Sequence, residues 1–253
     1  MFEKNFFSSS PWGFRFFELP DYCRTLKSLG IDQLSFMVGP EDGFPQALKG
    51  GSARAGEFRD IMAQNGVSAI ECAMLLDGSD DDIRLIAGIG AKYLRICEVW
   101  EHTPASFSDV SAKLRTLGKK AADHGLTVIV ENHGGLMANS SDCLRLFEAV
   151  AEPNVTLNYD AANFLHYGGE DALDALKATR EIIGFTHLKN VTESGFEKGK
   201  FCRVADGVID YTAILAELGK FYDGCLCLEY EEPADVVQGT SDDLEALKKI
   251  TGK

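Results

Sequence analysis

The sequence predicts an α/β protein that folds as a closed (β/α)8 barrel. Short apolar runs alternate with amphipathic stretches about eight times, which is typical of a parallel sheet with helices between its strands. The runs are rich in Val, Ile, Leu, Phe and Cys, as buried parallel strands are. The length of 253 residues also suits such a barrel, which typically takes about 250 residues. In chain order, the expected strands are residues 5–10, 32–38, 67–75, 92–100, 126–133, 154–160, 183–190 and 224–231.

Helices are expected between these strands, where apolar residues recur with helical spacing. In residues 108–125 the apolar residues fall on one face, with Ser108 as the expected N-cap and Gly125 just past the helix end. Residues 140–153 form a second such stretch, with Ser140 or Ser141 as the expected cap. Two further helices are expected over residues 210–221 and 240–252, the latter with Thr240 or Ser241 as N-cap.

The joints between helices and strands support the same fold. In KSLGIDQL, AQNGVSAI, AGIGAKYL and ADHGLTVI a helix is expected to end at glycine and a strand to begin at once. No Pro-rich linker or low-complexity tract divides the chain, and no glycine-rich nucleotide-binding motif follows a strand. We therefore expect a single barrel domain over residues 1–253, and not an open nucleotide-binding sheet.

Composition excludes several classes of function. The hydrophobic content of 45% argues against disorder, and the net charge of −14 argues against a nucleic-acid partner. Seven scattered cysteines without a C-x-x-C pair indicate reduced thiols, most of them core residues. No signal peptide and no run of the ~20 apolar residues needed to span a bilayer is found. We expect a cytoplasmic protein without a membrane partner, and a homo-oligomer is possible.

Four consecutive expected strands end in titratable residues, and these residues are the first indication of function. In a barrel of this kind the active site lies at the carboxyl ends of the strands. A single carboxylate at a strand end is most often a helix N-cap or a surface group. Four such ends in succession favour a shared site, because the two-residue period of strands can point all four side chains into the barrel. These residues are Glu131, Asp160, His187 and Glu229.

Such a group of side chains is suited to a divalent cation. Three carboxylates close together in a dry site would repel one another, and a bound cation removes that repulsion. Three carboxylates and one imidazole suit Mn²⁺, Mg²⁺ or Co²⁺ better than a closed structural Zn²⁺ site. Cys225 and Cys227 share the inner face of their strand, either as barrel filling or as soft ligands. His133 is interpreted as a substrate contact or as a hydrogen-bond partner behind the ligands.

The motifs VIVENHGG, LNYDAANF, THLKN, RVADGVIDY and LCLEYE occur in this order along the chain. In this they resemble the xylose isomerase-like TIM barrels and, more narrowly, the sugar phosphate isomerase/epimerase family. That family includes ketose 3-epimerases, hydroxypyruvate isomerase and inosose dehydratase. The resemblance covers nearly the whole chain and is strongest from about residue 90 onward.

The resemblance implies one divalent metal ion held by the four residues named above. It also implies that Glu131 and Glu229 exchange a proton next to a carbonyl, through an enediolate that the metal stabilises. The expected activity is that of an isomerase or epimerase of a small keto-sugar or sugar derivative, with Mn²⁺ as the first expectation and Mg²⁺, Co²⁺ or Zn²⁺ as alternatives. A lyase or dehydratase acting on a keto-sugar, keto-inositol or keto-glycoside is the alternative activity. A barrel that only binds a ligand is a third interpretation.

The resemblance further implies a set of substrate contacts, and here the chain departs from the family in places. Asn163 stands where the family often has a histidine, Asn190 replaces the aspartate of an H-x-K-D motif, and Ser35 lies where an inward glutamate is common. These departures leave the substrate open. The expected substrate-binding residues are His133, Asn163, Lys189, Arg203 and Trp100.

Overall fold

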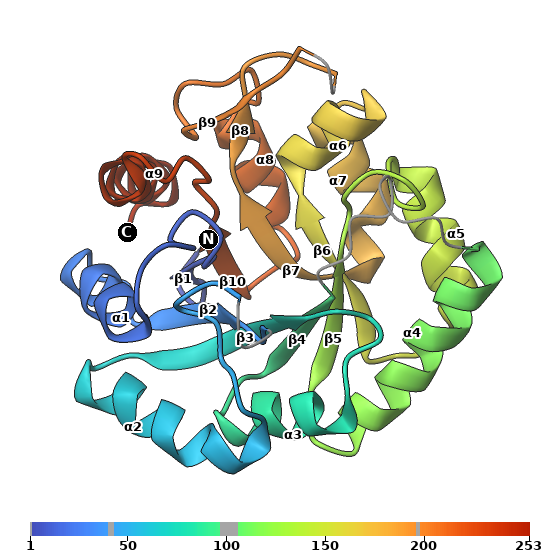
Figure 1. The fold of residues 1–253 in the computed structure, drawn as a ribbon. Coiled ribbons are helices and arrows are strands. Elements are labelled where there is room, and N and C mark those ends of the chain that lie inside the picture. Colours follow the sequence, from blue (N-terminus) through green and yellow to red (C-terminus); the bar gives the residue numbers. More distant parts are fainter. Residues whose placement is uncertain (1, 40–42, 97–105, 196–197) are drawn as a thin grey trace.

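A computed structural model gives the fold, and it describes residues 2–39, 43–96, 106–195 and 198–253. Eight parallel strands close into a barrel in the order β1-β10-β7-β6-β5-β4-β3-β2, with helices around the outside (Figure 1). The predicted (β/α)8 architecture is confirmed. The strands that build the barrel are β1 (Phe6–Ser9), β2 (Gln33–Met37), β3 (Ser68–Met74), β4 (Tyr93–Ile96), β5 (Thr127–Glu131), β6 (Val155–Asp160), β7 (Ile183–Leu188) and β10 (Cys225–Leu228).

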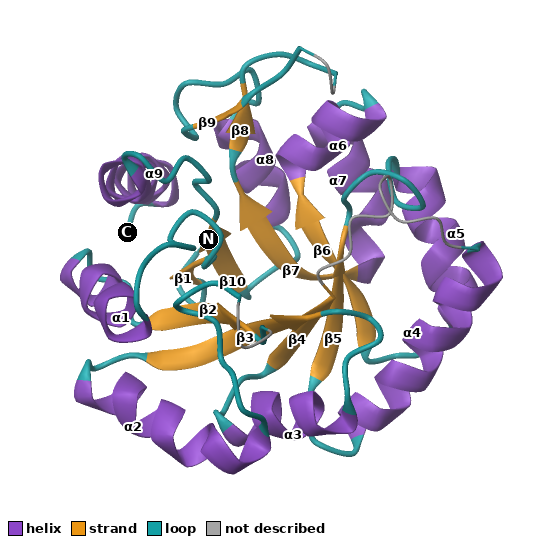
Figure 2. Cartoon of the chain, viewed as in Figure 1, coloured by secondary structure: helices purple, strands orange, loops and turns teal. Residues whose placement is uncertain are grey.

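The α-helices pack on the outer face of the barrel, as the colouring by secondary structure shows (Figure 2). Within the described ranges, none of them is long and apolar enough to cross a membrane. The helices are α1 (Leu19–Ser28), α2 (Ala55–Gln64), α3 (Asp80–Gly88), α4 (Phe107–Ala122), α5 (Ser140–Val150), α6 (Ala161–Gly168), α7 (Ala172–Thr179), α8 (Tyr211–Leu218) and α9 (Val236–Thr251), with short 3₁₀ turns at Ser52–Arg54 and Arg180–Ile182.

Two helices begin slightly earlier than their sequence predicted. The N-cap of α4 is Ser106, two residues before the predicted Ser108, and its hydroxyl accepts a hydrogen bond from the Asp109 N–H at 3.1 Å. The N-cap of α5 is Asn139, just before the two predicted serines, and its side chain accepts from the Asp142 N–H at 3.0 Å. In both cases the residue that can reach the third helical N–H becomes the cap.

The start of α9 was predicted wrongly. The helix begins at Val236, so Thr240 and Ser241 lie inside it and cap nothing. Asp235 precedes the helix without a side-chain cap, and the Tyr230 hydroxyl donates to its carboxylate at 2.7 Å. Tertiary contacts, including the burial of Val236, therefore set the start of the helix. They outweigh the better N-cap residues that the sequence has further along, at Thr240 and Ser241.

The glycines at the helix-to-strand joints adopt the backbone conformation expected of them. Gly30, Gly66, Gly90 and Gly125 have φ between +68° and +89°, a left-handed region that glycine enters without steric cost. Each therefore allows a helix to end and a strand to begin within a few residues.

The barrel interior contains an apolar cluster below its mouth, and the predicted strand faces are confirmed there. The filling includes Ile129, Phe185, Cys225 and Cys227, which lie on the same strand faces as the titratable strand ends. The Cys225 thiol lies 2.9 Å from the Ser8 hydroxyl, as barrel filling and not as a ligand. The six described cysteines are all free thiols.

A short antiparallel pair of strands, β8 (Asn190–Val191) and β9 (Phe201–Cys202), follows β7 and was not predicted. The Asn190 side chain holds the loop after this pair, donating to the Val204 and Ile209 carbonyls and accepting from the Ile209 N–H. An amide can donate and accept at once, which an ionised aspartate cannot. This gives Asn190 a structural role at the position where the chain departs from the family motif.

Candidate active site

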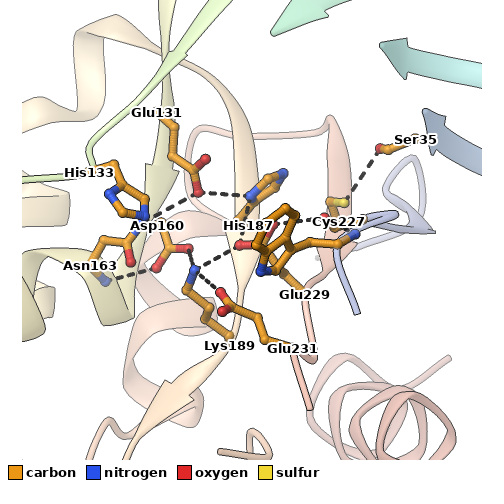
Figure 3. A network of polar contacts seen from close by, with 12 residues as sticks. Ser35, Glu131, His133, Asp160, Asn163, His187, Lys189, Cys227, Glu229 and Glu231 are labelled. Carbon is orange, nitrogen blue, oxygen red and sulfur yellow. Dashed lines mark hydrogen bonds and ion pairs between the residues drawn. The ribbon is translucent and has the colours of Figure 1, made fainter. Parts of the chain in front are cut away.

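Four side chains from adjacent strands converge at the carboxyl end of the barrel (Figure 3). Glu131 ends β5, Asp160 ends β6, His187 lies in β7 and Glu229 follows β10. All four are buried, and one ligand atom from each lies within 4.8 Å of every other. The structure thus brings together the whole set that the strand ends suggested.

Direct contacts join these four residues. His187 Nδ1 lies 2.9 Å from Glu131 Oε1 and 3.1 Å from Glu229 Oε2, so one imidazole nitrogen bridges the two glutamates. Asp160 Oδ1 accepts the Asn163 N–H at 2.9 Å and caps α6. Asp160 therefore acts as a helix cap through Oδ1, as a strand-end carboxylate often does, while its Oδ2 faces the cluster.

The atoms left over in the cluster fit a metal ion. Asp160 Oδ2 is buried and has no hydrogen-bond partner within the described residues, with the Lys189 ammonium 3.3 Å away as a charge partner, although buried polar atoms are nearly always hydrogen-bonded. Three carboxylates and one imidazole match the oxygen and nitrogen ligands of divalent cations. These residues could therefore hold a divalent metal ion.

Electrostatics in the cluster show how strongly it favours a positive charge. Burial opposes the ionisation of Glu131, yet the positive charge of His187 lowers its pKa to about 2. Burial lowers the pKa of His187, but Glu229 and Glu131 outweigh it and raise that pKa well above the usual range. Burial and the neighbouring glutamates raise the pKa of Asp160 to about 7, against the charge of Lys189. Without a metal, protons supply the positive charge that these carboxylates need.

Lys189 brings a second positive charge to the same cluster. Its ammonium lies 2.8 Å from Glu229 Oε2, 2.6 Å from Glu231 Oε1 and 3.3 Å from Asp160 Oδ2. The side chain is buried, and the ammonium also faces the Phe201 ring at 4.4 Å. Glu231 is not among the site residues predicted from the sequence, although its two-residue spacing from Glu229 points its side chain the same way.

A buried ion pair that the sequence did not reveal supports Glu131 from the other side. Arg95 in β4 places Nε 3.0 Å from Glu71 Oε1 and Nη1 3.2 Å from Glu131 Oε2. Glu71 lies in β3 and has no exposed surface. The pair lies next to β2, where Ser35 is the register partner of Glu71.

Glu229 has a matching contact from β1. The Ser10 hydroxyl, just past the end of that strand, donates to Glu229 Oε1 at 2.7 Å. Each of the two glutamates therefore has one oxygen at His187 and the other held by a donor outside the proposed ligand set.

A cavity of about 280 Å³ opens above the cluster. His133 and Lys189, both expected to bind substrate, are among its lining residues, and the Tyr167 hydroxyl lies 3.3 Å from His133 Nε2. Glycines at positions 134 and 135, with positive φ, turn the chain away after His133. The lining residues are Trp12, Met37, Arg95, Glu131, His133, Tyr167, Lys189, Phe201, Glu229 and Glu231.

The other three expected substrate contacts lie elsewhere or outside the description. Asn163 lies behind the carboxylates, with its Nδ2 at 3.4 Å from Glu131 Oε1, and does not line the described cavity. Arg203 forms ion pairs with Asp235 at 2.6 Å and Asp242 at 3.3 Å, also away from the lining. Trp100 falls outside the described residues.

Comparisons with known proteins agree with this architecture. A family model described as xylose isomerase-like TIM barrel matches residues 12–250. An inosose dehydratase of Clostridium perfringens is 27% identical over 156 residues, which are 55% of this chain and 52% of that protein. The chain therefore spans about half the length of the curated relatives it matches.

Solved structures match over nearly the whole chain. A xylose isomerase-like TIM barrel protein from Mycobacterium smegmatis, in complex with magnesium, has a TM-score of 0.77 and 18% identity, covering 96% of this chain and 95% of that one. A D-allulose 3-epimerase from Methylomonas sp. has a TM-score of 0.74 and 13% identity, covering 96% and 97%. At these identities the likeness shows the fold alone.

Proposed function

We propose that this chain, which belongs to the xylose isomerase-like TIM barrel family, is a divalent-metal-dependent isomerase or epimerase of a small keto-sugar or sugar derivative. The observation that carries the proposal is the placement of Glu131 and Glu229. Both carboxylates contact one imidazole nitrogen and both line the same cavity. Two carboxylates at one small cavity can remove a proton next to a carbonyl and return one.

Glu131, Asp160, His187 and Glu229 would hold the ion, because one ligand atom from each lies within 4.8 Å of every other and all four side chains are buried. Mn²⁺ is our first choice, and Mg²⁺, Co²⁺ and Zn²⁺ are alternatives. When bound, the ion would polarise the carbonyl and the neighbouring hydroxyl of the sugar.

The chain's own residues supply the proton transfers and the orientation of the substrate. Glu131 is fixed by the Arg95 guanidinium and Glu229 by the Ser10 hydroxyl, so the carboxylates keep their orientation as a proton moves. His133 and Lys189 line the cavity and present groups that can hydrogen-bond to sugar oxygens.

A lyase or dehydratase is the second candidate, and the similarity to the inosose dehydratase of C. perfringens favours it. Such a reaction begins with the same proton removal, but a hydroxyl then leaves as water and needs a proton donor. His133, next to the Tyr167 hydroxyl in the cavity wall, is placed to supply that proton. Product analysis separates the two reactions, because loss of water lowers the mass and epimerisation does not.

The test is solvent exchange in D₂O with Mn²⁺-loaded protein, read by NMR across a panel of ketoses and keto-inositols. We expect exchange of one C–H next to the carbonyl of the true substrate, abolished by Glu131→Gln and by Glu229→Gln. Glu245→Gln, an exposed change on α9, is the matched control and should leave exchange unchanged. Absence of exchange and of elimination across the panel would overturn the proposal. A barrel that also shows no metal-dependent rise in melting temperature would then be a ligand-binding protein.

A further inference from the structure

We propose that Glu231 is a specificity-determining residue, which neutralises Lys189 and so restricts the cavity to uncharged sugars, excluding phosphorylated and carboxylated ones. This inference rests on the proposed function and names the substrate class that the site accepts. It concerns a carboxylate outside the four residues proposed to hold the metal.

The argument begins with the partners of Lys189. Three carboxylates surround its ammonium, and two of them, Asp160 and Glu229, belong to the proposed metal set. The charges of those two would be shared with the ion. Glu231, whose Oε1 lies 2.6 Å from the ammonium, is then the carboxylate left to neutralise it.

The other permanent cation in the described lining is neutralised in the same way. Arg95 is paired with Glu71, which also lies outside the proposed metal set and is completely buried. Each cavity cation therefore has a carboxylate partner of its own. Three carboxylates around a divalent ion leave one further negative charge, so the cavity offers no excess of positive charge to an anionic group.

The rest of the lining suits a neutral polyhydroxylated molecule. Trp12, Tyr167 and Phe201 offer faces for the C–H groups of a sugar, while the charged groups offer hydrogen bonds to hydroxyls. Phe201 also covers the ammonium of Lys189. The residues outside the description, 1, 40–42, 97–105 and 196–197, include no lysine or arginine that could bind a phosphate.

Glu231 is also placed where a substrate would meet it. Its side chain is 21% exposed and lines the cavity, while that of Lys189 is only 2% exposed. An anion approaching the ammonium would therefore have to displace or lie against this carboxylate. Replacing it by glutamine keeps the shape and removes the charge.

The test measures binding of methyl phosphate to the Mg²⁺-loaded protein by calorimetry, in the wild type, Glu231→Gln and Glu232→Gln. Removing a charge next to the ammonium should raise the affinity of Glu231→Gln for methyl phosphate about tenfold or more. Glu232→Gln makes the same change at the next residue, which is exposed, and should behave as the wild type. Adding Lys189→Gln to Glu231→Gln should abolish the gain. Equal affinity in the wild type and Glu231→Gln would overturn the inference.

A second measurement compares neutral sugars with their phosphates. The wild type should bind a ketose more tightly than the same ketose carrying a 6-phosphate, and Glu231→Gln should narrow that difference. A wild type that binds the phosphorylated sugar more tightly would also overturn the inference. Failure of the proposed function is read separately, as absence of C–H exchange, because methyl phosphate binding requires no turnover.

Discussion

The two halves of the barrel differ in what their inward side chains do. Strands β5, β6, β7 and β10 lie side by side and bring the four candidate metal ligands together. Strands β1 to β4 and the residues that follow them bring polar groups that hold two of those ligands. Ser10 donates to Glu229, and Arg95 donates to both Glu131 and Glu71. The half made of β5, β6, β7 and β10, here the ligand half, would bind the ion. The half made of β1 to β4, here the supporting half, holds the glutamates in place. Four predictions test this division.

The largest expected effect concerns the buried pair in the supporting half. Arg95→Met leaves Glu71 without its partner at a fully buried position, which should lower the free energy of unfolding by ~3–5 kcal/mol. Replacing both residues, as in Glu71→Leu with Arg95→Met, should recover most of that loss, since the charge of Glu71 is removed and Glu131 keeps His187 as its partner. Urea unfolding of both variants measures this. A double variant no more stable than the single one would contradict the prediction.

The next effect concerns the ligand half. Asp160→Asn keeps a cap for α6 but removes a charged ligand, so the affinity for Mn²⁺ should fall at least about 100-fold. Calorimetric titration of metal-free protein measures it, with Asp174→Asn, at an exposed position on α7, as the control. Unchanged affinity in Asp160→Asn would remove this residue from the ligand set.

Metal binding should also depend on pH. Asp160, with a pKa of about 7, and His187, with a raised pKa, must lose their protons before they can hold a cation. Mn²⁺ affinity should therefore rise between pH 6 and pH 8, by up to about tenfold per pH unit for each proton displaced. Glu131, with a pKa of about 2, is ionised throughout this range. An affinity that stayed constant from pH 6 to pH 8 would contradict this.

The smallest expected effect is at Ser10. Ser10→Ala removes one hydrogen bond to Glu229 and should cost about 1 kcal/mol of stability. Because the hydroxyl orients a proton carrier without binding metal, C–H exchange should slow while Mn²⁺ affinity stays the same. Ser9→Ala, whose hydroxyl donates to the backbone carbonyl of Ser10 at 3.3 Å, is the control and should leave exchange unchanged.

The same division explains what the sequence could and could not reveal. The ligand half was predictable because its polar residues stand at strand ends, directly after apolar runs. Glu71 and Arg95 lie within their strands. The inward direction of Glu71 is also hard to predict because the β2–β3 pairing contains a register shift. Leu34 pairs with Ala69, but the next residue, Ser35, pairs with Glu71. Such a bulge brings both Ile70 and Glu71 inside, and simple alternation along β3 cannot place them together.

Positions set by tertiary contacts were also beyond sequence reasoning. The expectation that Arg203 would reach the substrate came from a motif, yet two acidic residues near the start of α9 engage its guanidinium. The start of α9 itself depends on Tyr230 and on a buried valine. Local patterns indicate where elements lie, whereas the partners of long side chains depend on segments far along the chain.

The number of residue pairs that join neighbouring strands differs around the barrel. The β7–β10 and β1–β2 pairings each have two register positions, whereas every other barrel pairing has at least four. His187 and Glu229 lie on opposite sides of the β7–β10 seam. An ion shared by them would cross-link it and close the intervening chain into a loop, reducing the entropy of any opened state. Metal binding would thus stabilise one of the two barrel pairings with the fewest register positions among the described residues.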